Sequence, residues 1–94
     1  MSRVSEKPYF LYVLWSVSGR CFYIGISDNP LARLQQHNGT LVGWTKRHRP
    51  WTLVFSEQHA DYRSARKREI ELKAQKGGKG FFAKTGLDPK CFDH

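Results

Sequence analysis

Five polar side chains of this sequence have the types needed to act on a phosphate group. They are two tyrosines, an arginine, a histidine and a glutamate, at Tyr12, Tyr23, Arg33, His37 and Glu69. A guanidinium stabilises charge on phosphate oxygens, a carboxylate can hold a divalent cation, and a tyrosine or histidine can move a proton. These residues can act together only if the predicted elements bring them to one site.

The two tyrosines are predicted to share one face of a β-hairpin. YFLYVLWS is typical of a strand entering a turn, and CFYIGI of the returning strand. If residues 18–19 are the centre of the turn, Tyr12 pairs with Gly25 and Leu14 with Tyr23, all on one face. Gly25 would leave a gap beside Tyr12, because glycine in a strand often marks a close approach. Taken alone, each tyrosine could be a packing residue, and a shift of register would separate the two.

Arg33 and His37 are predicted on one face of a short helix, from about Pro30 to Asn38. DNP marks its start, because asparagine can cap a helix and proline suits its first position, and HNG marks its end. Residues four apart share a helix face, so both side chains border the sheet beside a stripe made by Leu31 and Leu34. Taken alone, either could be a solvated rim residue.

Glu69 is predicted near the buried side of a longer helix, which starts at residue 61 or 64 and ends at about residue 75. That side consists of Tyr62, Ala65 and Leu72. A carboxylate in this position needs a partner. Salt bridges to Arg66 and Lys73 are one alternative, and a bound Mg²⁺ or Mn²⁺ ion is the other, because hard oxygen ligands suit both ions.

The whole chain of 94 residues is predicted to form one small α+β domain. WTLVFSE supplies a third strand after a polar loop, and KGFFAKTG a short helix followed by an irregular tail. The order ββαβαα predicts a three-stranded, largely antiparallel sheet flanked by helices. We expect a core over about residues 9–84 and a tail over residues 85–94.

The charge of the chain points to a polyanionic partner. Sixteen Lys and Arg against eight Asp and Glu give a formal charge of +8. The candidate nucleic-acid contacts are Lys46, Arg47 and Arg49 in one predicted loop, and Lys76 and Lys79 at the end of the long helix. An ordinary basic surface without a nucleic-acid partner is the alternative.

Several other classes of protein do not fit the sequence. No apolar run approaches the roughly 18 residues of a membrane span, and the first residues lack the apolar stretch of a secretory signal, so we expect a cytoplasmic protein with no membrane partner. Cys21 and Cys91 have no metal-ligand spacing, and a disulfide between them is not expected in a reducing compartment.

Four segments together resemble the GIY-YIG nuclease superfamily, especially its small stand-alone bacterial members. FLYVL is followed by FYIGI, LARLQQHN and ARKREIELK, and the resemblance runs from about Tyr9 to Phe82. The chain is similar also to the nuclease domains of the repair incision subunit and of the Slx1 structure-specific nucleases. Phe10 and Leu11 stand where Gly and Ile give the family its name, so their side chains are expected to be structural.

The resemblance implies a metal-dependent endonuclease of DNA repair that hydrolyses phosphodiester bonds. In the family pattern Glu69 binds one Mg²⁺ or Mn²⁺ ion, Arg33 stabilises charge on the phosphate, and His37 lies one turn after the arginine. One of the two tyrosines acts as general base and the other positions the water or phosphate; Tyr12 is favoured as the base, and the sequence leaves open which tyrosine has which role. An unperturbed tyrosine has a pKa of about 10, so ionising Tyr12 at pH 7 costs roughly 4 kcal/mol and needs a nearby cation or hydrogen bond.

The resemblance also bears on partners. We expect a monomer or weak dimer that acts on branched or nicked DNA, senses shape rather than sequence, and is weakly active without a protein partner for targeting. Two alternatives remain open: a non-catalytic nucleic-acid-binding module on the same fold, and a protein-interaction domain whose basic surface is incidental.

Overall fold

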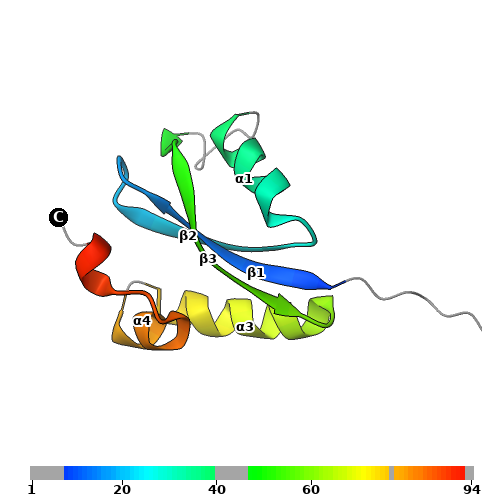
Figure 1. Ribbon diagram of the computed structural model, residues 1–94. Helices are drawn as coiled ribbons and strands as arrows, with labels where there is room; N and C mark the ends of the chain where they lie inside the picture. Colours follow the sequence, from blue (N-terminus) through cyan, green and yellow to red (C-terminus); the bar gives the residue numbers. More distant parts are fainter. Residues whose placement is uncertain (1–7, 40–46, 77, 93–94) are drawn as a thin grey trace, which may run out of the picture.

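The computed structural model describes residues 8–39, 47–76 and 78–92 (Figure 1). The elements are β1 (Tyr9–Ser16), β2 (Cys21–Ser27), α1 (Pro30–Asn38), β3 (Trp51–His59), α3 (Tyr62–Ala74), α4 (Lys79–Thr85) and the 3-10 helix η1 (Pro89–Phe92). Their order confirms the predicted α+β arrangement ββαβαα.

The sheet has the order β2-β1-β3, and both strand pairs are antiparallel. Tyr12 lies opposite Gly25 and Leu14 opposite Tyr23, so the predicted register of the hairpin is confirmed. Strand β1 is central, which leaves β2 as an edge strand. A register shift against β3 between Val13 and Leu14 marks a β-bulge in this pairing.

Helices cover both faces of the sheet, with α1 on one side and α3 and α4 on the other (Figure 1). Because successive strand residues point to opposite faces, the core divides into two clusters. The first contains Leu11, Val13, Trp15, Phe22, Ile24, Leu72 and Phe81. The second contains Tyr12, Leu14 and Trp51, with Tyr23 and Leu34 packed against them. The tyrosines therefore lie in the layer between the sheet and α1.

Helix α1 has the predicted bounds, but its buried face differs from the prediction. The side chain of Asn29 accepts a hydrogen bond from the backbone N–H of Ala32 at 3.2 Å, as expected for a cap. Leu31 is 64% exposed, so the predicted stripe is wrong at this residue, whereas His37 is 1% exposed. The reason is that Leu34 and His37 together face the sheet, which turns Leu31 toward solvent.

Helix α3 also starts as predicted, because the Asp61 side chain accepts a hydrogen bond from the backbone N–H of Ser64 at 2.9 Å. Ala65, Glu69 and Leu72 are buried, but Tyr62 is 54% exposed and does not belong to the buried side. As the first residue of the helix, Tyr62 instead makes an edge-to-face contact with Tyr9, with ring centroids 5.5 Å apart.

The segment after α4 is more ordered than the predicted irregular tail. Gly86 ends α4 in the left-handed conformation, with φ of 78°, and η1 follows. Leu87 and Phe92 pack against the first core cluster, so this segment completes the core beneath the sheet. Cys21 and Cys91 are free thiols. Within the described part of the chain, no helix has the length and apolarity needed to cross a bilayer.

Candidate active site

Tyr12, Tyr23 and His37 form one cluster between the sheet and α1. The hydroxyl of Tyr12 lies 3.2 Å from Nε2 of His37, and both side chains are only 1% exposed. The ring of Tyr23 lies 4.6 Å from that of His37 and 6.2 Å from that of Tyr12, measured between centroids. The hairpin register and the turn of α1 thus deliver three residues that are distant in sequence to one place.

Gly25 makes room for this cluster. A Cβ atom at Gly25 would lie 2.7 Å from the hydroxyl oxygen of Tyr12, 2.8 Å from its Cζ and 3.0 Å from Cε2 of Tyr23. The space that glycine leaves beside Tyr12 is therefore filled by the rings of the two tyrosines, and no open gap remains there. Glycine is needed here because the Tyr12 hydroxyl leans over the edge strand.

Replacing Gly25 by alanine should displace both tyrosines. Aromatic rings cannot yield as a flexible chain end does, so we expect a loss of about 1–3 kcal/mol in the free energy of unfolding, the usual cost of overpacking. Thermal and denaturant unfolding measure this loss. Gly78→Ala is the matched control, because a Cβ there meets its nearest atom at an ordinary 3.4 Å. Equal stability of the two variants would contradict the close fit at Gly25.

Arg33 lies one helical turn before His37 and belongs to the same site. Its Nη1 donates a hydrogen bond to Oε1 of Gln36 at 2.7 Å, which fixes the guanidinium along α1. Arg33 also acts on the pKa values of both Tyr12 and His37, so it lies close to their polar atoms. Among Tyr12, Tyr23, Arg33 and His37, Arg33 carries the only permanent positive charge, and its side chain is only partly buried.

Burial controls the ionisation of Tyr12. Loss of solvent raises its pKa to about 12, although hydrogen bonding to Arg33 and the charge of Arg33 act in the lowering direction. Tyr23 raises the pKa further, by its own charge and by hydrogen bonding. In the free protein, therefore, Arg33 does not lower the pKa of Tyr12 enough for the hydroxyl to ionise at neutral pH.

His37 is a neutral imidazole at neutral pH. Burial lowers its pKa below the ordinary value of 6.5, and the positive charge of Arg33 lowers it further. Its Nδ1 atom is buried and has no hydrogen-bond partner among the described residues. In the tautomer with the proton on Nδ1, Nε2 accepts a hydrogen bond from the Tyr12 hydroxyl.

This buried histidine predicts a loss of stability in mild acid. In the unfolded chain the pKa of His37 returns to about 6.5, so below that pH the unfolded state binds more protons than the folded state. The free energy of unfolding should fall as the pH is lowered from about 7 to about 5. Urea titrations across this range measure the slope. A His37→Gln variant should show a shallower slope, and identical slopes in the two proteins would contradict the assignment.

Glu69 is buried on α3 and carries two ion pairs. Its Oε1 lies 2.7 Å from Nη1 of Arg66, and its Oε2 lies 2.9 Å from Nζ of Lys73. Burial acts to raise the pKa of the carboxyl, but hydrogen bonds and charges of Lys73 and Arg66 outweigh it and hold the pKa below its usual range. The salt bridges considered from the sequence are thus present, and the carboxylate is ionised at neutral pH.

The structure places Glu69 in the other helical layer, across the sheet from α1 (Figure 1). Helix α3 begins beside Tyr9, and Lys76, two residues after its last residue, lies near Cys21, so the helix runs along the hairpin. Glu69 lies near the middle of α3, and this helix packs against both β1 and β2. Four of the five candidate residues meet on the α1 side, and the fifth approaches the same strand from the α3 side.

The donor atoms of the described residues fit only a sparsely ligated cation. No group of three or more His, Cys, Asp or Glu side chains that could hold a metal ion occurs within residues 8–39, 47–76 and 78–92. Glu69 offers one ionised carboxylate of hard oxygens. This suits Mg²⁺, which commonly takes one or two carboxylates and keeps waters and substrate phosphate as its other ligands.

No pattern in the sequence singles out Asn38, which fixes α1 on the sheet beside the site. Its Nδ2 donates to the backbone oxygen of Trp51 at 3.1 Å, and its Oδ1 accepts from the backbone N–H of Trp51 at 2.5 Å. The only signal was the HNG ending, which indicated the end of a helix. Trp51 itself is 3% exposed and belongs to the core.

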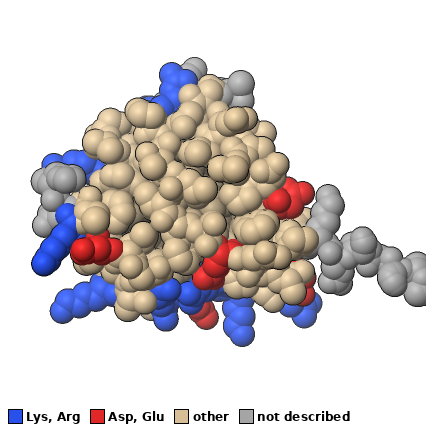
Figure 2. Space-filling model, viewed as in Figure 1, with Lys and Arg blue, Asp and Glu red and all other residues tan. Residues whose placement is uncertain are grey.

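The predicted nucleic-acid contacts lie on the surface where the structure describes them. Arg47, Arg49, Lys76 and Lys79 are exposed, whereas Lys46 falls outside the described residues. Figure 2 shows Lys and Arg side chains gathered along the edge formed by α3 and α4, while the centre of the same view is largely uncharged. In this view many of the basic side chains therefore lie on the helical layer that carries Glu69, and others lie at the top and left of the molecule.

Comparison with known proteins agrees with this arrangement. The family model described as the GIY-YIG catalytic domain matches residues 8–81. A structure-specific endonuclease subunit SLX1 homolog of Leishmania major is 51% identical over 58 residues, which cover 54% of this chain and 8% of that protein. The structure-specific endonuclease subunit slx1 of Pyrenophora tritici-repentis is 44% identical over 61 residues, which cover 55% of this chain and 17% of that protein.

A UPF0213 protein of Desulfotalea psychrophila is 34% identical over 72 residues, which cover 73% of this chain and 64% of that protein. The chain thus spans only a small part of the SLX1 relatives and less than two thirds of the UPF0213 relative. The match to the family model is more extensive, because it runs through all five candidate residues and most of the chain. The chain therefore belongs to the GIY-YIG catalytic domain family.

Proposed function

We propose that this protein is a metal-dependent endonuclease that hydrolyses phosphodiester bonds in DNA and selects its substrate by shape. The observation that carries the proposal is the buried contact of Tyr12 with His37, beside Tyr23 and Arg33, in a chain of a catalytic-domain family. The SLX1 relatives are named structure-specific endonuclease subunits, which supports selection by shape and a protein partner that directs the enzyme.

Tyr12 is proposed to activate water through a relay. With a pKa of about 12, its ionisation at pH 7 would cost about 7 kcal/mol, so a free tyrosinate is a poor starting point. In the relay, Tyr12 takes a proton from the attacking water as its own proton passes to Nε2 of His37. The tyrosinate never accumulates. Neutral His37 can accept this proton because Nε2 holds no hydrogen in the tautomer that accepts from Tyr12.

Arg33 and Tyr23 are proposed to hold the phosphate in line with the water. A guanidinium presents several N–H donors in a fixed plane, which suits the non-bridging oxygens as negative charge builds on them. Tyr23 is less deeply buried than Tyr12, so its hydroxyl is the better placed of the two to meet substrate or water. This division agrees with Tyr12 as the proton acceptor and Tyr23 as a positioning group.

Glu69 is proposed to hold one Mg²⁺ or Mn²⁺ ion at the edge strand. When bound, such an ion neutralises charge on the scissile phosphate and on the leaving oxygen. The side chains of Arg66 and Lys73 are 49% and 50% exposed, so both can turn away from the carboxylate toward solvent or DNA phosphates.

The test is cleavage of end-labelled single-stranded, duplex, nicked, flap and four-way-junction DNA with Mg²⁺, Mn²⁺ or EDTA. We expect metal-dependent cuts that favour the branched or nicked substrates. Glu69→Gln should abolish cleavage, because the amide keeps the shape of the side chain but loses the charge that holds the cation. Glu71→Gln is the matched control on the same helix, because that side chain is 45% exposed and pairs only with Arg68 among the described residues.

Two outcomes would overturn the proposal. Salt-sensitive DNA binding without cleavage under any metal, unchanged by Glu69→Gln, would identify a nucleic-acid-binding module instead. Cleavage that persists in EDTA and in Glu69→Gln would show that the reaction does not depend on a metal ion. Circular dichroism and thermal melting of each variant separate loss of chemistry from loss of fold.

A further inference from the structure

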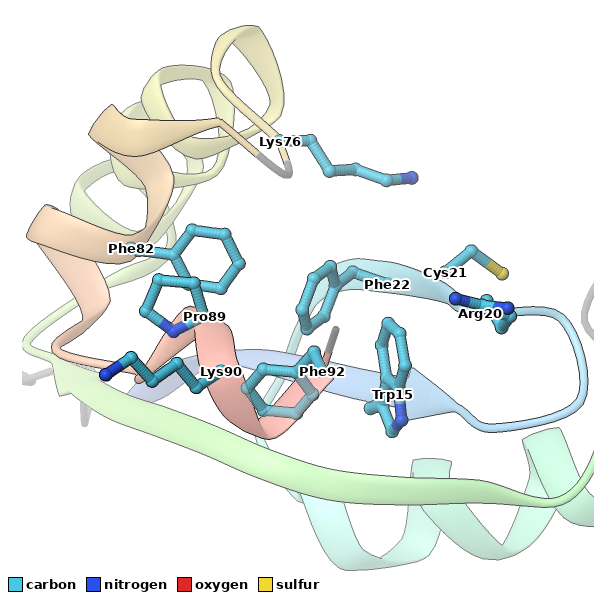
Figure 3. Close-up of a pocket in the computed structure, with 9 residues that line it drawn as sticks. All are labelled: Trp15, Arg20, Cys21, Phe22, Lys76, Phe82, Pro89, Lys90 and Phe92. Atoms are coloured by element: carbon cyan, nitrogen blue, oxygen red, sulfur yellow. The ribbon is translucent and has the colours of Figure 1, made fainter. Parts of the chain in front are cut away.

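A pocket of about 520 Å³ opens on the side of the sheet away from α1, between the hairpin and the C-terminal segment (Figure 3). Its volume lies within the roughly 300–1,000 Å³ typical of small-molecule sites. Four aromatic rings form its wall, those of Trp15, Phe22, Phe82 and Phe92. Trp15 and Phe22 are 7% and 6% exposed, whereas Phe82 and Phe92 are only half-buried, so the outer rings offer accessible faces.

The rings are arranged around Phe92 at the C-terminal end. Its centroid lies 5.0 Å from that of Trp15 and 5.1 Å from that of Phe22. The Phe82 ring lies 6.3 Å away with an interplanar angle of 26°. A flat aromatic ligand in this pocket would contact the edges and faces of several rings. Nucleobases stack on aromatic side chains arranged in this way.

Three cations surround this apolar wall. Arg20, Lys76 and Lys90 line the pocket and are exposed, and none of the described residues that line it is acidic. Arg20 adopts a positive φ of 53°, which is uncommon outside glycine, at the end of the hairpin turn. Figure 3 shows that the three side chains come from the hairpin, the end of α3 and η1 respectively. Like charges gathered from three separate elements favour an anionic ligand over a purely apolar one.

The pocket adjoins the candidate active site through the edge strand. Cys21 lines the pocket and also packs against the second core cluster, next to Tyr23. Cys21 and Tyr23 are two residues apart on β2, which is about 7 Å along a strand. One polynucleotide strand crossing β2 could therefore reach both places with neighbouring nucleotides.

We propose that this pocket holds an unpaired nucleobase of the DNA strand, stacked on Phe92 and Phe82, with adjoining phosphates against Arg20, Lys76 and Lys90. The proposal rests on the proposed function and deepens it, because it names single-stranded DNA beside the cut as the feature that is recognised. Stacking is tolerant of base identity, since every base has an aromatic face, so recognition here would follow shape and not sequence.

The experiment is fluorescence anisotropy with the protein in EDTA, so that no strand is cut. The probes are a short labelled strand of thymidines and an abasic strand of the same length, which keeps the phosphates but has no bases. Phe92→Ala should weaken binding of the thymidine strand by about 5- to 150-fold, the range for loss of one stacked base. It should leave binding of the abasic strand unchanged. Lys90→Glu should weaken binding of both strands.

Val17→Ala is the matched control, because this apolar side chain at the hairpin turn is 66% exposed and lies outside the pocket. The exposed Lys90→Glu variant keeps the proposal testable if Phe92→Ala fails to fold. Unchanged binding of the thymidine strand by both variants would overturn the pocket site, as would equal weakening of both strands by Phe92→Ala. Failure of the wild-type protein to bind either strand would also overturn it.

The pocket and the nuclease can fail separately. One result would support the nuclease and overturn the pocket site: metal-dependent cleavage that is lost in Arg33→Ala, with binding of the thymidine strand unchanged by Phe92→Ala. Base-dependent binding lost in Phe92→Ala, in a protein that cuts none of the DNA shapes, would support the pocket site and overturn the nuclease.

Discussion

Replacing Tyr12 by phenylalanine should lower the rate of the cleavage step by about 10²- to 10⁴-fold, the usual contribution of a positioned acid or base. The reason is that the phenylalanine ring fills the same space but removes the oxygen that meets Nε2 of His37 at 3.2 Å. Single-turnover cleavage of a branched DNA with excess protein measures this step directly. Affinity for the same DNA should change little, because Tyr12 is 1% exposed.

The controls for Tyr12→Phe separate chemistry from stability. Losing the hydroxyl leaves Nε2 of His37 buried without its partner, so the free energy of unfolding should fall by about 1–3 kcal/mol, and melting curves must show that the variant remains folded. Tyr23→Phe should have a smaller effect on the rate. A larger effect of Tyr23→Phe than of Tyr12→Phe would exchange the roles of the two tyrosines.

The same relay determines the pH dependence of the wild-type protein. His37 must be neutral to accept the proton, and its pKa lies below 6.5, so the rate should rise from acid pH and level off near neutral pH. If Tyr12 had to ionise fully instead, the rate would keep rising into alkaline pH, toward its pKa of about 12. A continuous rise would therefore reject the relay while keeping Tyr12 as the base.

Replacing Arg33 by alanine should lower the single-turnover rate by about 10²- to 10³-fold, the cost of removing one donor that stabilises developing charge. Arg33→Lys should recover only part of this loss, because an ammonium keeps the charge but lacks the planar set of donors. DNA affinity should fall only modestly, since fifteen of the sixteen basic residues remain after the change.

Arg63→Ala is the matched control for Arg33→Ala, because Arg63 is an exposed arginine near the start of α3. It removes the same charge from the chain without touching the tyrosine cluster. Equal losses in the two variants would show that Arg33 contributes only to the general attraction of DNA. Loss of affinity without loss of rate at saturating protein would lead to the same conclusion.

Much of the fold follows from local sequence signals. Asn29 and Pro30 specify the start of α1, and Asp61 caps α3, because these side chains satisfy or omit backbone N–H groups that a helix leaves unpaired. The short turn sets the hairpin register, and a one-residue shift would move every side chain of the strand to the opposite face.

Packing between elements did not follow from the sequence. Leu31 was expected in the core and His37 at its rim, but in the structure Leu31 is exposed and His37 is buried. The reason is that the packing of α1 against Tyr12 and Tyr23 determines which face of the helix is buried. Tyr62 was expected to be buried, but as the first residue of α3 it lies beside Tyr9 and is half exposed. The segment after Gly86 packs into the core through Leu87 and Phe92, although its sequence has no clear periodicity.

The sequence by itself determined which side chains can do chemistry, the order of the elements, and the hairpin pairing that puts Tyr12 beside Gly25 and Tyr23 on the same face. These depend on residue type and local period alone. Only the tertiary structure decided that Tyr12 and His37 share a buried hydrogen bond, that burial raises the pKa of Tyr12, and that Glu69 approaches β2 from the other layer. Desolvation and the stacking of layers arise from contacts between distant segments, so no local pattern encodes them.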